Sequence, residues 1–282
     1  MQSLTVKQAI SEAKEMGKNS QFLGMLEIYI LLGHVLNKPK SFLQLNNDLI
    51  VSENDYQNFI ELCNLRLKGK PVAKIIGQKD FWKDRFYTNE YTLDPRPDSE
   101  TLIEEVLKNY KNADEKLEII DLGTGTGCLA LSLVREYKNA HATLVDKSVD
   151  ALKVAKKNAI SLGLEGNTSF VESNWLDNVS GNFDIIISNP PYIPNLDIDK
   201  LDIQVNFDPE GALFGGSDGL SCYREIASSL KKVCKQTSLI FFEIGENQET
   251  DIANIMQNNG FVLHNMAKDL AGIIRVCVFK LP

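Results

Sequence analysis

The sequence is poor in the residues that build metal sites and disulfide frameworks. Its 282 residues include five cysteines and three histidines. No two cysteines form a CxxC pair, and the histidines lie far apart along the chain. An odd number of scattered cysteines argues against a disulfide framework, and isolated histidines argue against a zinc site. We therefore expect no bound metal, reduced thiols and a cytoplasmic location.

Long apolar runs and an excess of positive charge are missing as well. No apolar stretch reaches the length of a membrane-spanning helix, so we expect no association with a membrane. The formal net charge is −8, whereas binding to duplex DNA normally requires a basic surface that displaces counterions. We therefore expect no stable nucleic-acid binding, although the total charge alone does not exclude a local basic groove.

The first 70 or so residues have the apolar spacing of helices. Thr5, Ser20 and Ser52 each stand where they would cap the start of a helix, and Gly69 and Pro71 end the last of these helices. The apolar faces of such helices have to pack on one another. Residues 1–72 are therefore predicted to form a small helical bundle.

A different pattern separates this bundle from the rest of the chain. Residues 81–93 read FWKDRFYTNEYTL, in which aromatic and polar side chains alternate with a break at Thr88–Asn89. Such a pattern predicts a β-hairpin. We assign residues 73–96 to a linker that contains this hairpin, and residues 97–282 to a second domain.

After Lys116 the chain alternates between strand and helix patterns. Apolar segments predict seven strands, which read LEIID, ATLVD, TSFVE, FDIIIS, TSLIFFEIG, FVLHNM and IIRVCVF. Strands separated by amphipathic helices predict an α/β fold with a parallel sheet that helices cover on both faces. The last two strands have no helix between them, so we expect one of them to run antiparallel.

A glycine-rich loop joins the first of these strands to a helix. It reads IDLGTGTGC, and its glycines let the backbone turn tightly and approach a ligand closely. Asp146 ends the second strand, where a carboxylate can bind both ribose hydroxyls, and Asp121 is placed to attract an α-amino group. A tight turn without a ligand and a plain helix cap at Asp146 are the alternatives. The candidate cofactor contacts are Asp121, Gly123, Thr124, Gly125, Thr126, Gly127 and Asp146.

A second motif, SNPPYIPN, follows the fourth strand. The nitrogen of an amide or aromatic amine is planar and its lone pair is delocalised, so its alkylation needs a rigid orienting site. The Asn189 side-chain oxygen and the Pro190 carbonyl offer two acceptors for one NH2 group. Tyr192 can stack on a flat substrate, and the two prolines fix φ. We predict Asn189, Pro190 and Tyr192 as catalytic residues and Pro191 as a further substrate contact. By itself the motif has a proline turn after a buried strand as its alternative, and it does not distinguish adenine from glutamine.

DLGTGTG, Asp146 and NPPY, in this order, resemble the class I AdoMet-dependent methyltransferases that alkylate an exocyclic or amide nitrogen. The resemblance implies a seven-stranded, mostly parallel, Rossmann-like sheet. It also implies S-adenosylmethionine as cofactor, S-adenosylhomocysteine as product, and further cofactor contacts from Asn174, Trp175 and Asn189. The family often has aspartate where this chain has Asn174, so we expect weaker selection of adenine.

Five further blocks resemble the HemK/PrmC family, and they read PVAKIIG, FW, PRPDSETL, GALFGGSDGL and EIG. Members of that family methylate the glutamine side-chain amide of the Gly-Gly-Gln loop in class-1 peptide chain release factors. They carry a helical substrate-recognition domain before the catalytic domain, a position that residues 1–72 match. The resemblance implies this reaction and a release factor as protein partner.

Three other functions are consistent with parts of the sequence. The PrmB family also carries NPPY and modifies a glutamine of a ribosomal protein, but its arginine block reads PRSP, so Arg96–Asp98 favours the release-factor branch. Nucleic-acid adenine N6-methyltransferases usually carry a basic target-recognition region, which this acidic chain does not suggest. The third is an AdoMet-binding regulator without turnover.

Overall fold

The computed structural model describes residues 4–282, which form two compact units. One unit consists of the chain up to Gly77 together with Asp202–Phe207, and the other consists of Gln78–Leu201 and Asp208–Pro282. The domain boundaries at residues 72 and 96 were drawn from helix stops and pattern changes, and they stay a prediction.

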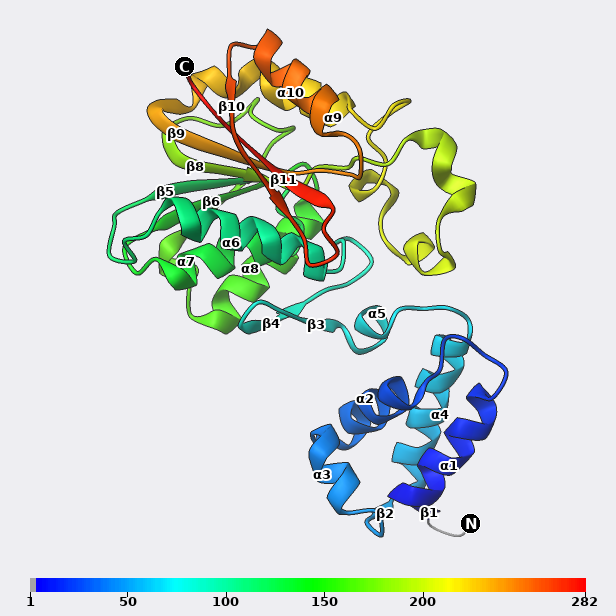
Figure 1. Cartoon of the computed structure of the whole chain (residues 1–282). Helices are drawn as coiled ribbons and strands as arrows, with labels where there is room; N and C mark the ends of the chain where they lie inside the picture. The colour runs from blue at the N-terminus through cyan, green and yellow to red at the C-terminus, as the bar shows by residue number, and fades with distance from the viewer. Residues whose placement is uncertain (1–3) are drawn as a thin grey trace. The chain divides into compact units, whose positions relative to one another are not determined.

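The first unit is mainly helical, as Figure 1 shows. Its helices and strands are β1 (Leu4–Thr5), α1 (Val6–Gly17), α2 (Met25–Leu36), α3 (Lys40–Leu45), β2 (Ile50–Val51), α4 (Glu53–Leu67) and α5 (Val72–Ile76). Strands β1 and β2 pair antiparallel. Val6, Leu31 and Phe59, from α1, α2 and α4, are fully buried in one apolar core. The predicted helical bundle is therefore confirmed.

Helix starts in this unit follow local capping chemistry. Thr5 caps α1 with a complete capping box, as the sequence predicts. The expectation that Ser20 starts the next helix is wrong, because α2 begins at Met25 with Gly24 as its N-cap. The Glu27 carboxylate accepts the Gly24 N–H, which satisfies a backbone group that the helix itself leaves without a partner.

The second unit is an α/β sandwich. Its helices and strands are β3 (Gln78–Phe81), β4 (Asp84–Tyr87), α6 (Glu100–Asn109), β5 (Glu118–Leu122), α7 (Cys128–Glu136), β6 (His141–Asp146), α8 (Val149–Leu162), β7 (Thr168–Glu172), β8 (Phe183–Ser188), α9 (Ser221–Ser229), β9 (Cys234–Glu243), α10 (Glu249–Asn258), β10 (Val262–Lys268) and β11 (Ile274–Lys280). Figure 1 shows α6, α7 and α8 on one face of the large sheet and α9 and α10 on the other.

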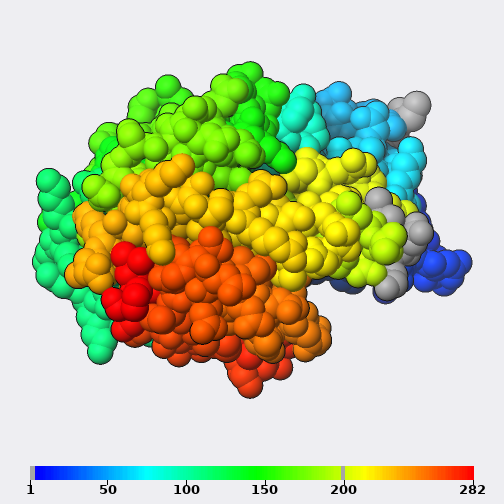
Figure 2. Space-filling view, turned by 90° about the horizontal axis from the view of Figure 1, so that it is seen from above, coloured from blue at the N-terminus to red at the C-terminus, as the bar shows by residue number. Residues whose placement is uncertain are grey.

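The large sheet has seven strands in the order β10-β11-β9-β8-β5-β6-β7. Five strands, β5 to β9, run parallel to one another, and β11 runs antiparallel to both β9 and β10. Both the seven-stranded, mostly parallel sheet and the antiparallel strand near the C-terminus are therefore confirmed. In the space-filling view of Figure 2, α10 and the edge strand β10, both in orange shades, lie side by side.

Alternating side chains of the central strands fill both layers of the core. Ile119 and Ile185 pack with the helices α6 to α8, whereas Ile120 and Ile186 pack with α9 and α10. The order of the strands reverses at β5, because the chain continues from β5 to β6 on one side of it and β8 pairs with β5 on the other side. Ligands of open α/β sheets bind beyond the carboxyl ends of the strands at such a switch point.

The hairpin formed by β3 and β4 differs from its predicted form. Its turn begins at Trp82, because Phe81 pairs with Asp84, and the expected break at Thr88–Asn89 falls after the hairpin. Trp82 has a φ of 54°, an unusual value for a bulky residue. Its backbone N–H donates to Glu100 over 2.8 Å, and its indole N–H donates to Glu136 over 2.7 Å. These contacts come from distant helices, so the alternation of the hairpin sequence could not reveal them.

Candidate active site

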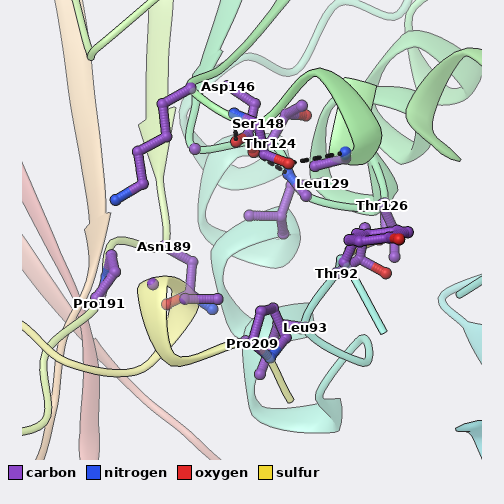
Figure 3. Close-up of a pocket in the computed structure, with 18 of the residues that line it drawn as sticks. Thr92, Leu93, Thr124, Thr126, Leu129, Asp146, Ser148, Asn189, Pro191 and Pro209 are labelled. Atoms are coloured by element: carbon purple, nitrogen blue, oxygen red, sulfur yellow. Dashed lines mark hydrogen bonds between the residues drawn. The ribbon is translucent and has the colours of Figure 1, made fainter. Parts of the chain in front are cut away.

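A cavity of about 210 Å³ lies at the carboxyl ends of the parallel strands. Its walls come from six segments of the second unit, which are Tyr91–Arg96 with Ser99, Gly123–Thr126 with Cys128 and Leu129, Asp146–Ser148 with Ala151, Ser173–Trp175, Asn189 with Pro191, and Pro209 with Gly211 and Ala212. Figure 3 shows Asp146 and Asn189 on different walls of this cavity, with Leu93 and Pro209 at a third position. Both sequence motifs therefore meet in one site.

The three glycines of the loop after β5 have different roles. All have positive φ, of 75°, 53° and 80°, which favours glycine over any other residue. A Cβ on Gly127 would lie 3.0 Å from Leu144, so this glycine lets α7 pack closely on β6. A Cβ on Gly125 would meet nothing within 4 Å, which matches the position of Gly125 on the cavity wall. The loop thus leaves room for a ligand at Gly125, while Gly127 lies outside the residues that line the cavity.

Asp146 is the last residue of β6 and holds the glycine loop through backbone groups. Its carboxylate accepts the N–H of Gly125 over 2.9 Å and the N–H of Ser148 over 2.9 Å, one on each oxygen. These bonds lie among the dashed lines of Figure 3. Burial raises the pKa of this carboxyl above its ordinary value, and the two backbone hydrogen bonds oppose that rise. Each oxygen keeps acceptor capacity for a hydroxyl in the cavity.

Asp121 lies at the end of β5, beneath the loop and outside the cavity lining. The Thr124 hydroxyl donates to its Oδ2 over 2.6 Å, whereas its Oδ1 is buried and has no hydrogen-bond partner within residues 4–282. Burial raises the pKa of the Asp121 carboxyl to about 7. A buried acceptor without a partner is costly, and a cationic or N–H-bearing ligand group would relieve that cost.

Trp175 and Asn174 follow β7 on the cavity wall. Trp175 has a φ of 48°, and its indole N–H donates to Glu225 over 2.9 Å. Its ring lies against Gly123, because a Cβ on that glycine would be 3.3 Å from the ring. Asn174 is exposed and lines the same cavity. The segment therefore adds one flat apolar surface and one amide to the site.

The NPPY turn begins directly after β8. The hydroxyl of Ser188 donates to the Leu122 carbonyl over 2.6 Å, which ties the end of β8 to β5. Asn189 and Pro191 line the cavity, whereas Pro190 and Tyr192 are not among its lining residues. Burial raises the pKa of the Tyr192 hydroxyl to about 12. The motif thus presents Asn189 and Pro191 to the cavity.

The segment that contains GALFGGSDGL braces this turn from outside. Gly215 N–H donates to the Ile193 carbonyl over 2.9 Å, and Ile193 N–H donates to the Leu213 carbonyl over 3.0 Å. A Cβ on Gly215 would lie 2.5 Å from the Pro191 carbonyl oxygen, and a Cβ on Gly219 would lie 2.3 Å from the Tyr192 carbonyl oxygen. Only glycine permits this close backbone approach.

A strap formed by residues 88–96 makes a wall that the motif analysis did not identify as part of the site. Asn158, fully buried on α8, ties the end of the hairpin that precedes this strap to the glycine loop. Its side-chain NH2 donates to the carbonyls of Thr126 over 2.8 Å and Tyr87 over 3.0 Å, and its oxygen accepts the Tyr87 N–H over 2.7 Å. The hairpin end and the glycine loop are therefore fixed to the same side chain.

Three other residues near the cavity were also missed as site residues. Arg96 lines the cavity and forms a 2.6 Å ion pair with the buried Asp208. Ser99 lines it as well and accepts a hydrogen bond from the Asn189 side chain. The PRPDSETL block contains two of these residues, but its composition alone assigns them no position. Among the described side chains, which leave out residues 1–3 and 198–200, no group of three or more His, Cys, Asp or Glu is placed to hold a metal ion. No helix in the described part of the chain has the length and apolarity to cross a membrane.

Two family models match separate parts of the chain. The model of the methyltransferase small domain matches residues 95–206, and the model of the PrmC N-terminal domain matches residues 9–77. A solved structure of ribosomal protein L11 methylase from Lactobacillus delbrueckii subsp. bulgaricus has a TM-score of 0.51 at 17% identity, over 72% of this chain and 89% of that one. That likeness shows a shared methyltransferase fold alone.

Relatives at higher identity cover nearly the whole chain. The release factor glutamine methyltransferase of Clostridium acetobutylicum is 36% identical over 279 residues, which are 97% of this chain and 97% of that protein. The bifunctional methyltransferase of Rickettsia felis is 35% identical over 98% of this chain, but the match covers only 58% of that longer protein. The chain thus spans little more than half of the latter relative. Because the match to the Clostridium acetobutylicum protein covers 97% of both chains, this chain belongs to the release factor glutamine methyltransferase family.

Proposed function

We propose that this chain transfers a methyl group from S-adenosylmethionine to the side-chain amide nitrogen of the glutamine in the Gly-Gly-Gln motif of class-1 peptide chain release factors. The observation that carries the proposal is that Asn189 and Asp146 line one cavity. The first supplies an oriented amide acceptor, and the second supplies a carboxylate at the end of a neighbouring strand. The name of the full-length relative specifies glutamine of a release factor as its substrate.

The residues of the cavity fit a nucleoside with a small amino-acid group. Gly125 borders open space and Asp146 has acceptor capacity for ribose hydroxyls. Beneath the loop and outside the cavity lining, Asp121 has a buried oxygen without a hydrogen-bond partner among the described residues. Trp175 and Asn174 provide a flat surface and an amide for a base. We assign cofactor binding to these residues and to the further members of the two motifs, Gly123, Thr124, Thr126, Gly127 and Asn189.

The bound cofactor would supply an electrophilic methyl group on a sulfonium, which leaves as a neutral thioether. Asn189 accepts one N–H of the substrate amide through Oδ1, and the Pro190 carbonyl accepts the other. Together they orient the nitrogen lone pair and raise its electron density. Pro191 stiffens the turn and contacts the substrate, while Tyr192 closes the site against water and stacks on the substrate amide. The nitrogen loses its proton to solvent once the new bond makes it acidic.

The domain assignment follows from the same proposal. Residues 1–72 would recognise the release factor, residues 73–96 would link the domains, and residues 97–282 would carry out methyl transfer. The match of residues 9–77 to the PrmC N-terminal domain supports the first of these roles.

A labelled-methyl transfer assay tests the proposed function. Purified chain and labelled S-adenosylmethionine are incubated with a class-1 release factor, with the same factor carrying alanine in place of the Gly-Gly-Gln glutamine, with ribosomal protein, and with duplex DNA or RNA. We expect label on the unmodified release factor only. Label that survives the glutamine-to-alanine change, or that appears on ribosomal protein or nucleic acid instead, contradicts the proposal.

A further inference from the structure

A buried glutamate lies next to the predicted catalytic amide. Strands β8 and β9 are parallel neighbours in which Ser188 pairs with Phe242. The residue after Ser188 is Asn189, which directly follows β8, and the residue after Phe242 is Glu243, which ends β9. The two residues therefore occupy adjacent positions at the carboxyl edge of the sheet. Glu243 is 2% exposed and does not line the cavity. An acid buried at this position requires an explanation, because removing a carboxylate from water is costly.

A serine completes the group on the side of α6. Ser99 is 3% exposed, lines the cavity, and accepts a hydrogen bond of 3.3 Å from the Asn189 side-chain nitrogen. Burial raises the pKa of Glu243 to about 7, and the nearby Ser99 and Asn189 side chains oppose that rise. The buried Oε2 of Glu243 has no hydrogen-bond partner among the described residues. Three polar side chains from three separate segments therefore converge at this wall of the cavity, two on its surface and Glu243 behind them.

These contacts define which end of the Asn189 amide reaches the cavity. An asparagine side chain has a donor end, the NH2 group, and an acceptor end, the oxygen. The hydroxyl of Ser99 accepts from the donor end, and the Glu243 carboxylate lies near enough for the Asn189 side chain to stabilise its charge. A carboxylate only accepts hydrogen bonds, so an amide rotated by 180° would place its oxygen against a negative charge. The rotated state is disfavoured, and the oxygen stays available to a substrate N–H.

We propose that Glu243 and Ser99 are positioning residues, which hold the Asn189 amide by its nitrogen so that its oxygen faces the substrate amide. This inference rests on the proposed function, because it gives Asn189 its orientation in that reaction. Neither residue contacts the reacting atoms, and their effect is exerted through Asn189.

Other charged and titratable groups around Glu243 come from several elements. Arg275 of β11 stabilises its negative charge, and Asp98, which precedes α6, opposes it. Tyr192, Tyr223 and Cys128 are also close enough to interact with it electrostatically. Protonated Glu243 carries an O–H donor that would tolerate the rotated amide. We therefore expect kcat to fall as the pH drops through about 7, the value to which burial raises the Glu243 pKa.

The kinetic experiment compares Glu243→Gln, Ser99→Ala and Ser99→Thr with a matched control, Glu105→Gln. Glu105 is a glutamate on α6 that is also buried, at 3% exposure, and its partners Lys108, Asn109 and Asn265 lie outside the cavity lining. We expect Glu243→Gln to lower kcat about tenfold and to flatten the pH profile, with cofactor Kd and thermal midpoint close to wild type. Ser99→Ala should lose part of kcat, and Ser99→Thr, which keeps the hydroxyl, should restore it. A Glu243→Gln variant with wild-type kcat and pH profile would overturn the inference.

A second measurement separates this inference from the proposed function. Carboxyl carbon NMR of glutamate-labelled protein, with the Glu243 signal assigned by Glu243→Gln, reports its pKa without any substrate. Asn189→Ala and Ser99→Ala should each raise that pKa, because each removes a group that stabilises the anion, whereas Glu105→Gln should not. An unmoved pKa in both variants refutes the positioning role even if wild type methylates the release factor. A wild type inactive on release factors, with the pKa raised in both variants, would refute the proposed function and support the orientation of the amide.

Discussion

The two ends of the cavity are built in different ways. At the ribose side, which is Gly123–Thr126 with Asp146, the structure is held by backbone groups. Gly123 and Thr124 both donate from their N–H groups to the Val145 carbonyl over 2.9 Å, and Gly125 donates to Asp146. At the amide side, which is Asn189 with Ser99 and Glu243, the contacts are between side chains.

This difference determines what kind of change each side tolerates. The ribose side depends on a backbone path with three left-handed glycines, so an added Cβ is harmful almost regardless of its chemistry. The amide side depends on the identity of donors and acceptors, so an isosteric substitution suffices to alter it. Binding of the cofactor and orientation of the substrate should therefore be separable by mutation.

Asn189→Ala is the sharpest test of that separation and should have the largest effect. It removes the side-chain acceptor while leaving Asp146 and its backbone contacts unchanged. We expect kcat to fall about 100- to 1000-fold and cofactor Kd to change less than about threefold. Transfer kinetics and calorimetry measure the two quantities. Asn195→Ala, in the same segment but outside the cavity lining, is the matched control. An equal loss in cofactor affinity would show that the two sides are not independent.

Asp121→Asn tests the electrostatic strain beneath the ribose side. Burial raises the Asp121 pKa from 3.8 to about 7. The folded state therefore binds a proton more tightly than the unfolded state, and the free energy of unfolding falls as the pH rises from about 4 to about 7. Replacing the acid with an amide should remove about 4 kcal/mol of this pH dependence at most, at about 1.4 kcal/mol for each pKa unit. Urea titrations at several pH values measure how the free energy of unfolding changes with pH. An unchanged dependence in the variant would show that Asp121 is not its source.

Asp146→Asn should weaken the ribose side with little effect on the amide side. An amide has one acceptor oxygen, whereas the carboxylate accepts from Gly125 and Ser148 on separate oxygens. One backbone N–H would then face an NH2 group. We expect cofactor Kd to rise about 30-fold, with kcat at saturating cofactor within about threefold of wild type. Asp150→Asn, which removes an exposed ion pair with Lys153, is the control by calorimetry. A loss of kcat larger than the change in cofactor Kd would show that the ribose side and the amide side are not independent.

Gln248→Met should have the smallest effect. Gln248 donates to the Tyr192 carbonyl over 3.0 Å and accepts the Gly245 N–H over 3.0 Å, so it braces the NPPY turn from α10. Methionine has a similar length but lacks both groups. We expect kcat to decrease about three- to tenfold at constant cofactor Kd. Gln257→Met, on an exposed position of the same helix, is the matched control. A wild-type kcat would show that the glycines around the turn suffice to hold it.

Much of the fold was predictable because it depends on local pattern. Apolar runs identified all seven strands of the large sheet, and the absence of a helix between the last two indicated the antiparallel strand. The errors occurred where distant groups decide the geometry. Trp82 adopts a left-handed conformation because Glu100 and Glu136 bind it, and Gly24 replaces Ser20 as a cap because Glu27 binds its N–H.

The residues of the site were predictable where they belong to motifs that are contiguous in the sequence. The glycine loop, Asp146 and Asn189 are recognisable from neighbouring residues, and the structure brings members of each to one cavity. Ser99 and Glu243 are 144 positions apart and reach Asn189 only through helix packing and strand register. No spacing in the sequence indicates such a convergence. The roles of the individual site residues stay predictions that the variants above test.

Asn158 limits how freely the parts of this enzyme fold can be exchanged. Because one amide bonds to both Tyr87 and Thr126, the hairpin and the glycine loop share a single anchor. In a chimaera that takes the hairpin from one relative and the sheet from another, compatibility at this anchor would decide whether the cavity keeps its wall. The hairpin is therefore not exchangeable independently of the sheet, although it lies in the segment that the sequence pattern assigns to a linker.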